Sequence, residues 1–73
     1  MTKKNLNRIV AKNIRKYRVK RKISQEKLAE LCNLHRTFIG SIERAERNIT
    51  LNTLESIANG LEMEVTKLLI DQE

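Results

Sequence analysis

Apolar residues recur at intervals of three and four along the chain, and no stretch alternates with a period of two. Such spacing places apolar side chains on one face of an α-helix. The pattern predicts helices over about residues 6–21, 24–32, 36–44 and 50–59. A last apolar segment at 65–71 is too short to form a stable helix alone. We therefore expect an all-α fold, a compact bundle of five short helices.

The predicted boundaries depend on residues with marked capping preferences. Ser24 and Thr50 can each accept a hydrogen bond as the N-cap of the helix that follows. Asn33 tolerates the left-handed conformation that ends a helix, and Gly60 stands where a C-terminal glycine is expected. Only about three residues separate the second and third helices, which is typical of a helix-turn-helix but also of a plain helical hairpin.

The distribution of charged residues favours a helix-turn-helix that binds DNA over a plain helical hairpin. The 73 residues include 15 Lys and Arg against nine Asp and Glu, giving a formal net charge of +6. Ten of the basic residues lie within residues 1–25, which contain no acid, whereas from residue 49 onward one base faces five acids. A polyanion would therefore be met by the first part of the chain. The acidic, apolar end is left for contact with a second copy.

Several function classes lack the residues that they need. A single cysteine excludes an internal disulfide, and a single histidine leaves a metal site short of ligands. We expect a single domain over residues 1–73, with no catalytic site, cofactor, metal or small-molecule ligand. No apolar run reaches the roughly 20 residues of a membrane span, and the start lacks a signal peptide, so we expect a cytoplasmic protein. Cys32 lies on an apolar stripe and is predicted to be a core residue.

The third predicted helix carries a short, hydrogen-bonding outer face. At about 100° per residue, Ile39 and Ile42 define its buried side. The residues predicted to lie opposite are Thr37, Gly40, Ser41 and Arg44. Short polar groups permit close approach to base edges, and an arginine such as Arg36 can bridge guanine O6 and N7. The alternative is that the arginines are ordinary solvated surface charges.

Four short motifs extend this pattern over nearly the whole chain. They are Ile14-Arg15 with Arg18, Ile23-Ser24-Gln25, Leu28-Ala29, and Arg36-Thr37-Phe38-Ile39 followed by Ile42-Glu43-Arg44. Together they resemble the Xre (Cro/repressor-type) helix-turn-helix family. Residues 35–44, with 46–50 and 54–55, are most similar to the controller proteins of restriction-modification systems. The resemblance implies a homodimeric regulator of transcription that binds a palindromic operator beside its own genes and autoregulates. A phage-type repressor and an antitoxin-like subunit remain alternatives.

The resemblance also implies roles for individual residues. Base reading falls to Arg36, Thr37, Ser41 and Arg44. Contacts with the DNA backbone, or the orientation of other side chains, fall to Gln25, Lys27, Phe38, Arg47 and Asn48. Phe38 fits a core aromatic equally well. Arg18 and Glu43 would form an ion pair that ties the first helix to the recognition helix. Lys22 departs from the family, which usually has glycine there, and His35 replaces a commoner Asp cap.

Self-association is expected because one recognition helix reads few bases. Two copies would bind adjacent major grooves about 34 Å apart. We expect the dimer surface within about residues 50–73, with Leu61, Met63, Val65, Leu68 and Leu69 divided between the core and the partner. Contact with RNA polymerase through Glu26 or Glu30 is an expectation from family analogy alone.

Overall fold

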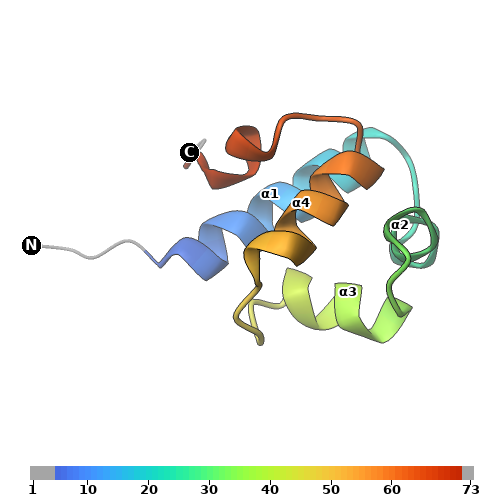
Figure 1. The fold of residues 1–73 in the computed structure, drawn as a ribbon, viewed down its shortest axis with the longest axis horizontal. Helices are drawn as coiled ribbons and strands as arrows, with labels where there is room; N and C mark the ends of the chain where they lie inside the picture. Colours follow the sequence, from blue (N-terminus) through green and yellow to red (C-terminus); the bar gives the residue numbers. More distant parts are fainter. Residues whose placement is uncertain (1–4, 72–73) are drawn as a thin grey trace, which may run out of the picture.

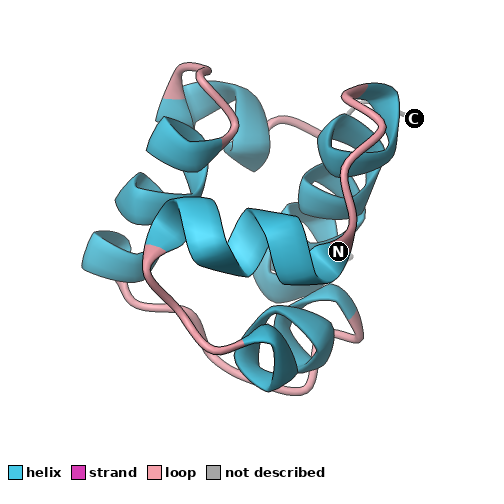
Figure 2. Cartoon of the chain, turned by 90° about the vertical axis from the view of Figure 1, so that its right-hand side faces the viewer, coloured by secondary structure: helices cyan, strands magenta, loops and turns pink. Residues whose placement is uncertain are grey.

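A computed structural model describes residues 5–71, which form four α-helices and one short 3-10 helix without any strand (Figures 1 and 2). The elements are α1 (Leu6–Lys20), α2 (Gln25–Cys32), α3 (Arg36–Glu43), α4 (Leu51–Gly60) and η1 (Val65–Leu69). The all-α helix-turn-helix prediction is confirmed, except that the fifth helix is a 3-10 turn. The predicted single domain also included residues 1–4, 72 and 73, which lie outside the described residues.

The helices are arranged around α1. In Figure 1, α3 lies along the lower edge of the molecule and the C-terminal segment runs along the opposite side. Both α3 and η1 contact α1, whereas α2 contacts α3 and α4. Figure 1 shows α2 end-on and α3 side-on, so the two helices of the tight pair cross rather than run parallel. This crossing leaves one side of α3 facing outward.

The predicted caps are present. Ser24 Oγ accepts a hydrogen bond from Lys27 N at 2.9 Å, and Thr50 Oγ1 accepts one from Thr53 N at 3.1 Å. Asn33 adopts the left-handed conformation with φ 59°. Lys22 does the same with φ 60°, where its Cβ costs about 1 kcal/mol relative to glycine. His35 caps α3 because its Nδ1 accepts from Thr37 N at 3.1 Å.

The prediction for Gly60 is wrong in its physical reason. Gly60 is the last residue of α4, no glycine has a positive φ, and the left-handed residue beyond the helix is Glu62 with φ 56°. A Cβ built on Gly60 would lie 2.6 Å from Cys32 Sγ, far inside van der Waals contact. Gly60 is therefore needed for the close approach of α4 to α2 rather than for backbone conformation.

One apolar core joins all five elements. Its buried members are Val10, Ile14, Leu28, Ala29, Cys32, Ile39, Ile42, Leu54, Ile57, Ala58, Leu61 and Leu68. Cys32 is a core residue as predicted, and burial raises the pKa of its thiol. Within residues 5–71, no helix combines the length and apolar character needed to cross a bilayer.

Candidate nucleic-acid interface

The outward side of α3 and the start of α2 form one polar surface, which we call the recognition face. It consists of Gln25 on α2 with Arg36, Thr37 and Arg44 on and just after α3. These four residues, together with Arg18, Ser24, Glu26 and Gly40, line an open hollow of ≈ 480 Å³. The structure therefore brings together three of the four residues expected to read bases, with Gln25 beside them.

Below the recognition face, α3 is fixed to α1 by the expected ion pair. Arg18 Nε lies 2.6 Å from Glu43 Oε2, and Arg18 Nη2 lies 3.1 Å from Glu43 Oε1. Gln25 Nε2 donates to the same Oε1 at 3.0 Å, and Arg18 Nη1 donates to Ile23 O at 2.9 Å. The two charged side chains are only 12% and 3% exposed. A bidentate, largely desolvated ion pair fixes both the distance and the angle between its two side chains. It therefore sets the orientation of α3 on α1.

Both arginines of the recognition face have an acidic neighbour. Arg36 Nη1 lies 3.3 Å from Glu26 Oε2, and Arg44 Nε lies 3.0 Å from Glu46 Oε2. The hydrogen bond from Arg44 lowers the pKa of Glu46, and the same bond raises that of Arg44. All four side chains are more than half exposed. Exposed pairs of this kind contribute little stability, so a ligand that offers a better acceptor can displace the carboxylates.

The predicted outward position of Ser41 is wrong. Ser41 is 7% exposed, and Gly40 beside it is also buried. Ser41 Oγ donates to Phe38 O at 2.8 Å and accepts from Arg47 Nε at 2.7 Å. The reason is that Arg47 folds back from the loop after α3 and covers this side of the helix. Without DNA, Ser41 therefore presents no group to a base edge and instead orients Arg47.

The other residues expected at the DNA backbone lie around this surface. Arg47 Cζ lies 4.9 Å from the centre of the Phe38 ring, which is half-buried against the core. Asn48 Oδ1 accepts from Asn7 Nδ2, so the loop after α3 is connected to α1. Lys27 Nζ lies 3.4 Å from Glu30 Oε1 on the exposed side of α2.

The residues predicted at the dimer surface divide into two groups. Leu61 and Leu68 are fully buried core residues, so they cannot contact a partner directly. Met63 and Val65 are half-buried against the core, and Leu69 is exposed. The exposed apolar residues that sequence reasoning missed on the C-terminal part are Leu51, 82% exposed, and Ile70, 54% exposed. The signal for Leu51 was its place directly after the Thr50 cap, before the inward stripe of α4 begins.

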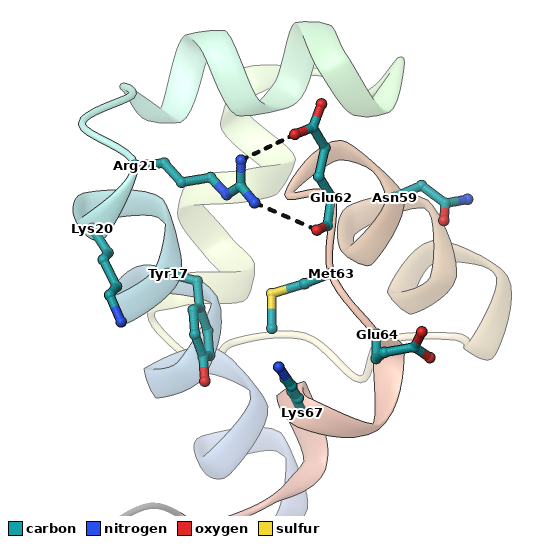
Figure 3. A pocket seen from close by; sticks show the side chains of 8 residues that line it. All are labelled: Tyr17, Lys20, Arg21, Asn59, Glu62, Met63, Glu64 and Lys67. Carbon is teal, nitrogen blue, oxygen red and sulfur yellow. Dashed lines mark hydrogen bonds and ion pairs between the residues drawn. The ribbon is translucent and has the colours of Figure 1, made fainter.

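A second hollow lies between the end of α1 and the segment from α4 to η1 (Figure 3). It has a volume of ≈ 690 Å³ and is lined by Tyr17, Lys20, Arg21, Asn59, Glu62, Met63, Glu64 and Lys67. Arg21 Nη1 lies 3.3 Å from Glu62 Oε1 at one rim, and the Met63 side chain points into the hollow. No residue of the recognition face lines it.

A buried polar residue on α1 was also missed. Asn13 lies inside the apolar stripe of α1, is 2% exposed, and donates hydrogen bonds to two backbone carbonyls near the C-terminus. The available signal was an amide at a position where helical spacing demands an apolar side chain. Within residues 5–71, no three His, Cys, Asp or Glu side chains are grouped so that they could hold a metal ion.

Comparison with known proteins places this geometry in a family. A helix-turn-helix family model matches residues 14–68. The chain is 52% identical over 68 residues to the control protein C.SmaI of Serratia marcescens, covering 93% of this chain and 81% of the relative. The crystal structure of the restriction-modification controller protein C.AhdI from Aeromonas hydrophila is 32% identical and superposes with a TM-score of 0.83, covering 85% of this chain and 94% of that one.

A further solved structure holds a relative on DNA. It is the tetramer of the restriction-modification controller protein C.Esp1396I in complex with its natural 35 base-pair operator. This chain is 39% identical to that protein, with a TM-score of 0.83 and coverage of 90% of this chain and 87% of that one. The chain therefore belongs to the helix-turn-helix family, among the control proteins of restriction-modification systems.

Proposed function

We propose that this chain is a sequence-specific regulator of transcription that binds a palindromic operator as a dimer and controls the genes of a restriction-modification system, including its own. The observation that carries the proposal is the recognition face. Its exposed hydrogen-bonding side chains lie on or beside α3, and the desolvated Arg18–Glu43 ion pair sets the orientation of that helix. A firmly held helix with exposed arginine and hydroxyl side chains is suited to the major groove.

Base reading is assigned to Arg36, Thr37 and Arg44. Each guanidinium can give up its carboxylate neighbour for guanine O6 and N7, an exchange between hydrogen-bonded states that costs little at an exposed site. Thr37 offers a hydroxyl and a methyl group at the N-terminal turn of α3. Ser41 acts indirectly, through its hydrogen bond to Arg47.

Backbone contacts are assigned to Gln25, Lys27, Arg47 and Asn48. Arg47 and Asn48 lie in the loop after α3, and Gln25 and Lys27 lie in the first turn of α2, where helix dipole and side chains both favour phosphate. The Phe38 ring packs against the Arg47 guanidinium and helps to hold it in place. These contacts are independent of sequence and make binding depend steeply on salt.

Dimer formation is supported by the exposed apolar residues of the C-terminal part and by the oligomer that the relative forms on its operator. The proposed surface lies within residues 50–71, with Leu51, Leu69 and Ile70 at its centre; residues 72 and 73 of the predicted range lie outside the described residues. Regulation then follows protein concentration through dimerisation. For contact with RNA polymerase, Glu26 and Glu30 are both candidates, since each carries an exposed carboxylate on α2.

The test is fluorescence anisotropy on the DNA upstream of the gene and on a scrambled copy, at two salt concentrations. We expect the upstream DNA to bind about a thousandfold more tightly, with two protomers per site. Arg36→Ala should lower that preference by about tenfold to a hundredfold. Arg21→Ala is the matched control, because it removes the same charge from a surface arginine outside the recognition face. Equal binding of both DNAs by the unaltered protein would refute the proposal.

A further inference from the structure

Asn13 joins the middle of α1 to the end of the chain. Its Nδ2 donates to Leu68 O at 2.9 Å and to Ile70 O at 2.8 Å, across 55 and 57 residues of sequence. Both partners are carbonyl oxygens, which only accept, so the orientation of the amide is fixed by chemistry. A neutral amide buried to this degree, with both donors used, is a specific attachment rather than filling of the core.

The segment that Asn13 holds is short and packs on α1 and α4. η1 has only five residues, and its N-cap, Glu64, makes no side-chain capping bond. Ile70 then returns to an extended conformation. Leu68 is fully buried and provides the apolar anchor, whereas Leu69 and Ile70, the residue that carries the second carbonyl, are exposed. We call Leu68, Leu69 and Ile70 the C-terminal turn. Its two exposed side chains are placed by Leu68 and Asn13 together.

We propose that Asn13 is the positioning residue of the dimer surface, an inference that rests on the proposed function. By fixing the carbonyls of Leu68 and Ile70, it presents Leu69 and Ile70 to a second copy in one orientation. Because the two apolar side chains are already ordered before they meet a partner, the entropy cost of association is lower. Asn13 itself is buried and touches neither the partner nor DNA.

The same helix that holds the C-terminal turn also holds α3. Arg18 binds Glu43 at a position five residues after Asn13, on α1. The spacing between the recognition face and the dimer surface is therefore set along one rigid helix. On a palindrome, two recognition helices must stand about one DNA turn apart, so a loosened C-terminal turn weakens binding to two half-sites more than binding to one.

The experiment uses the full chain with Asn13→Leu, which keeps a similar volume but removes both donors, and Asn13→Asp, which keeps the shape. Asn7→Asp is the matched control, because it makes the same chemical change on α1 at a site outside the proposed dimer surface. Sedimentation equilibrium gives the dimer dissociation constant, and amide hydrogen exchange follows residues 65–70 against α2 and α4. We expect both Asn13 variants to raise the dimer dissociation constant by about tenfold or more, with faster exchange confined to residues 65–70.

A third variant separates positioning from contact. Ile70→Gln should weaken the dimer while leaving exchange at residues 65–69 of the monomer unchanged, because both Asn13 bonds remain. Dimerisation of Asn13→Leu and Asn13→Asp equal to that of the unaltered protein overturns the inference and leaves the proposed function standing. A monomeric unaltered protein that still prefers its upstream DNA overturns the dimer proposal as well. Loss of protection in α2 and α4 would show a general structural role and also overturn the inference.

Discussion

Two attachments to α1 hold the two functional surfaces, and they use different chemistry. At one end Arg18 fixes α3 by two charged hydrogen bonds to Glu43, with both side chains largely desolvated. In the middle of the helix Asn13 holds the C-terminal turn by two neutral hydrogen bonds to backbone carbonyls. Charged bonds at a dry site are stronger and more directional than neutral ones. The difference indicates that the orientation of α3 is fixed more strongly than that of the C-terminal turn.

The largest expected effect is from removing one member of the charged attachment. Arg18→Ala leaves Glu43 without its main partner at a largely buried site, and we expect the free energy of unfolding to fall by about 3 kcal/mol. Thermal unfolding followed by circular dichroism measures the change.

Arg21→Ala is the control for charge alone, because Arg21 forms an exposed ion pair with Glu62. It should cost at most about 0.5 kcal/mol. Equal losses of unfolding free energy in Arg18→Ala and Arg21→Ala would contradict the prediction that the buried ion pair contributes more stability than the exposed one.

The next effect concerns Gly60, on the side of the core away from the recognition face. Gly60→Ala would bring a methyl group to 2.6 Å from Cys32 Sγ, so we expect a loss of about 1–2 kcal/mol despite the better helix propensity of alanine. Chemical denaturation measures it. Adding Cys32→Ala should restore most of the loss, since the clashing sulfur is gone; no recovery would show that backbone conformation is responsible instead.

Gly40 provides the contrasting glycine, on the recognition side. A Cβ there would lie 3.2 Å from Arg44 Nη1 and 3.4 Å from Gln25 Oε1, both at the ends of flexible side chains. We expect Gly40→Ala to leave stability within about 0.5 kcal/mol while lowering operator affinity about fivefold, because Arg44 must move. Unfolding curves and anisotropy titrations of the same sample compare the two effects. Unchanged operator affinity would remove Arg44 from base reading.

The smallest expected effect is a pH dependence at the edge of the recognition face. Because the hydrogen bond from Arg44 lowers the pKa of Glu46, this pair is complete above the usual titration range of a glutamate and is lost as the pH falls through the lowered value. Carbon-detected NMR of the Glu46 carboxyl should give a midpoint below the usual range of a glutamate. In Arg44→Ala the midpoint of Glu46 should rise toward that range.

Much of the helical framework followed from local sequence. Ser24 and Thr50 carry hydroxyls that suit an N-cap, and Asn33 accepts a positive φ, so helix ends were readable without tertiary information. Helical periodicity placed Thr37 and Arg44 on the outer face of α3, whereas the ion pair between Arg18 and Glu43 came from the family resemblance.

The failures share a cause, which is contact with residues outside the helix concerned. Gly60 looked like a helix terminator because its neighbour Cys32 is 28 positions away, and the sequence does not show which atoms face it. Ser41 looked outward-facing because the periodicity of α3 does not reveal that Arg47 returns over it. Leu68 was a candidate for the partner although the core already buries it completely.

The sequence by itself determined the helices, their order and the concentration of base at the start and acid at the end, because periodicity, capping and charge are local properties. Tertiary structure alone decided which apolar side chains stay exposed and which polar side chains are buried and hydrogen-bonded inside the protein. Asn13 shows the reason most clearly: its two acceptors are backbone carbonyls, which every residue carries, so no pattern of side chains could have marked them.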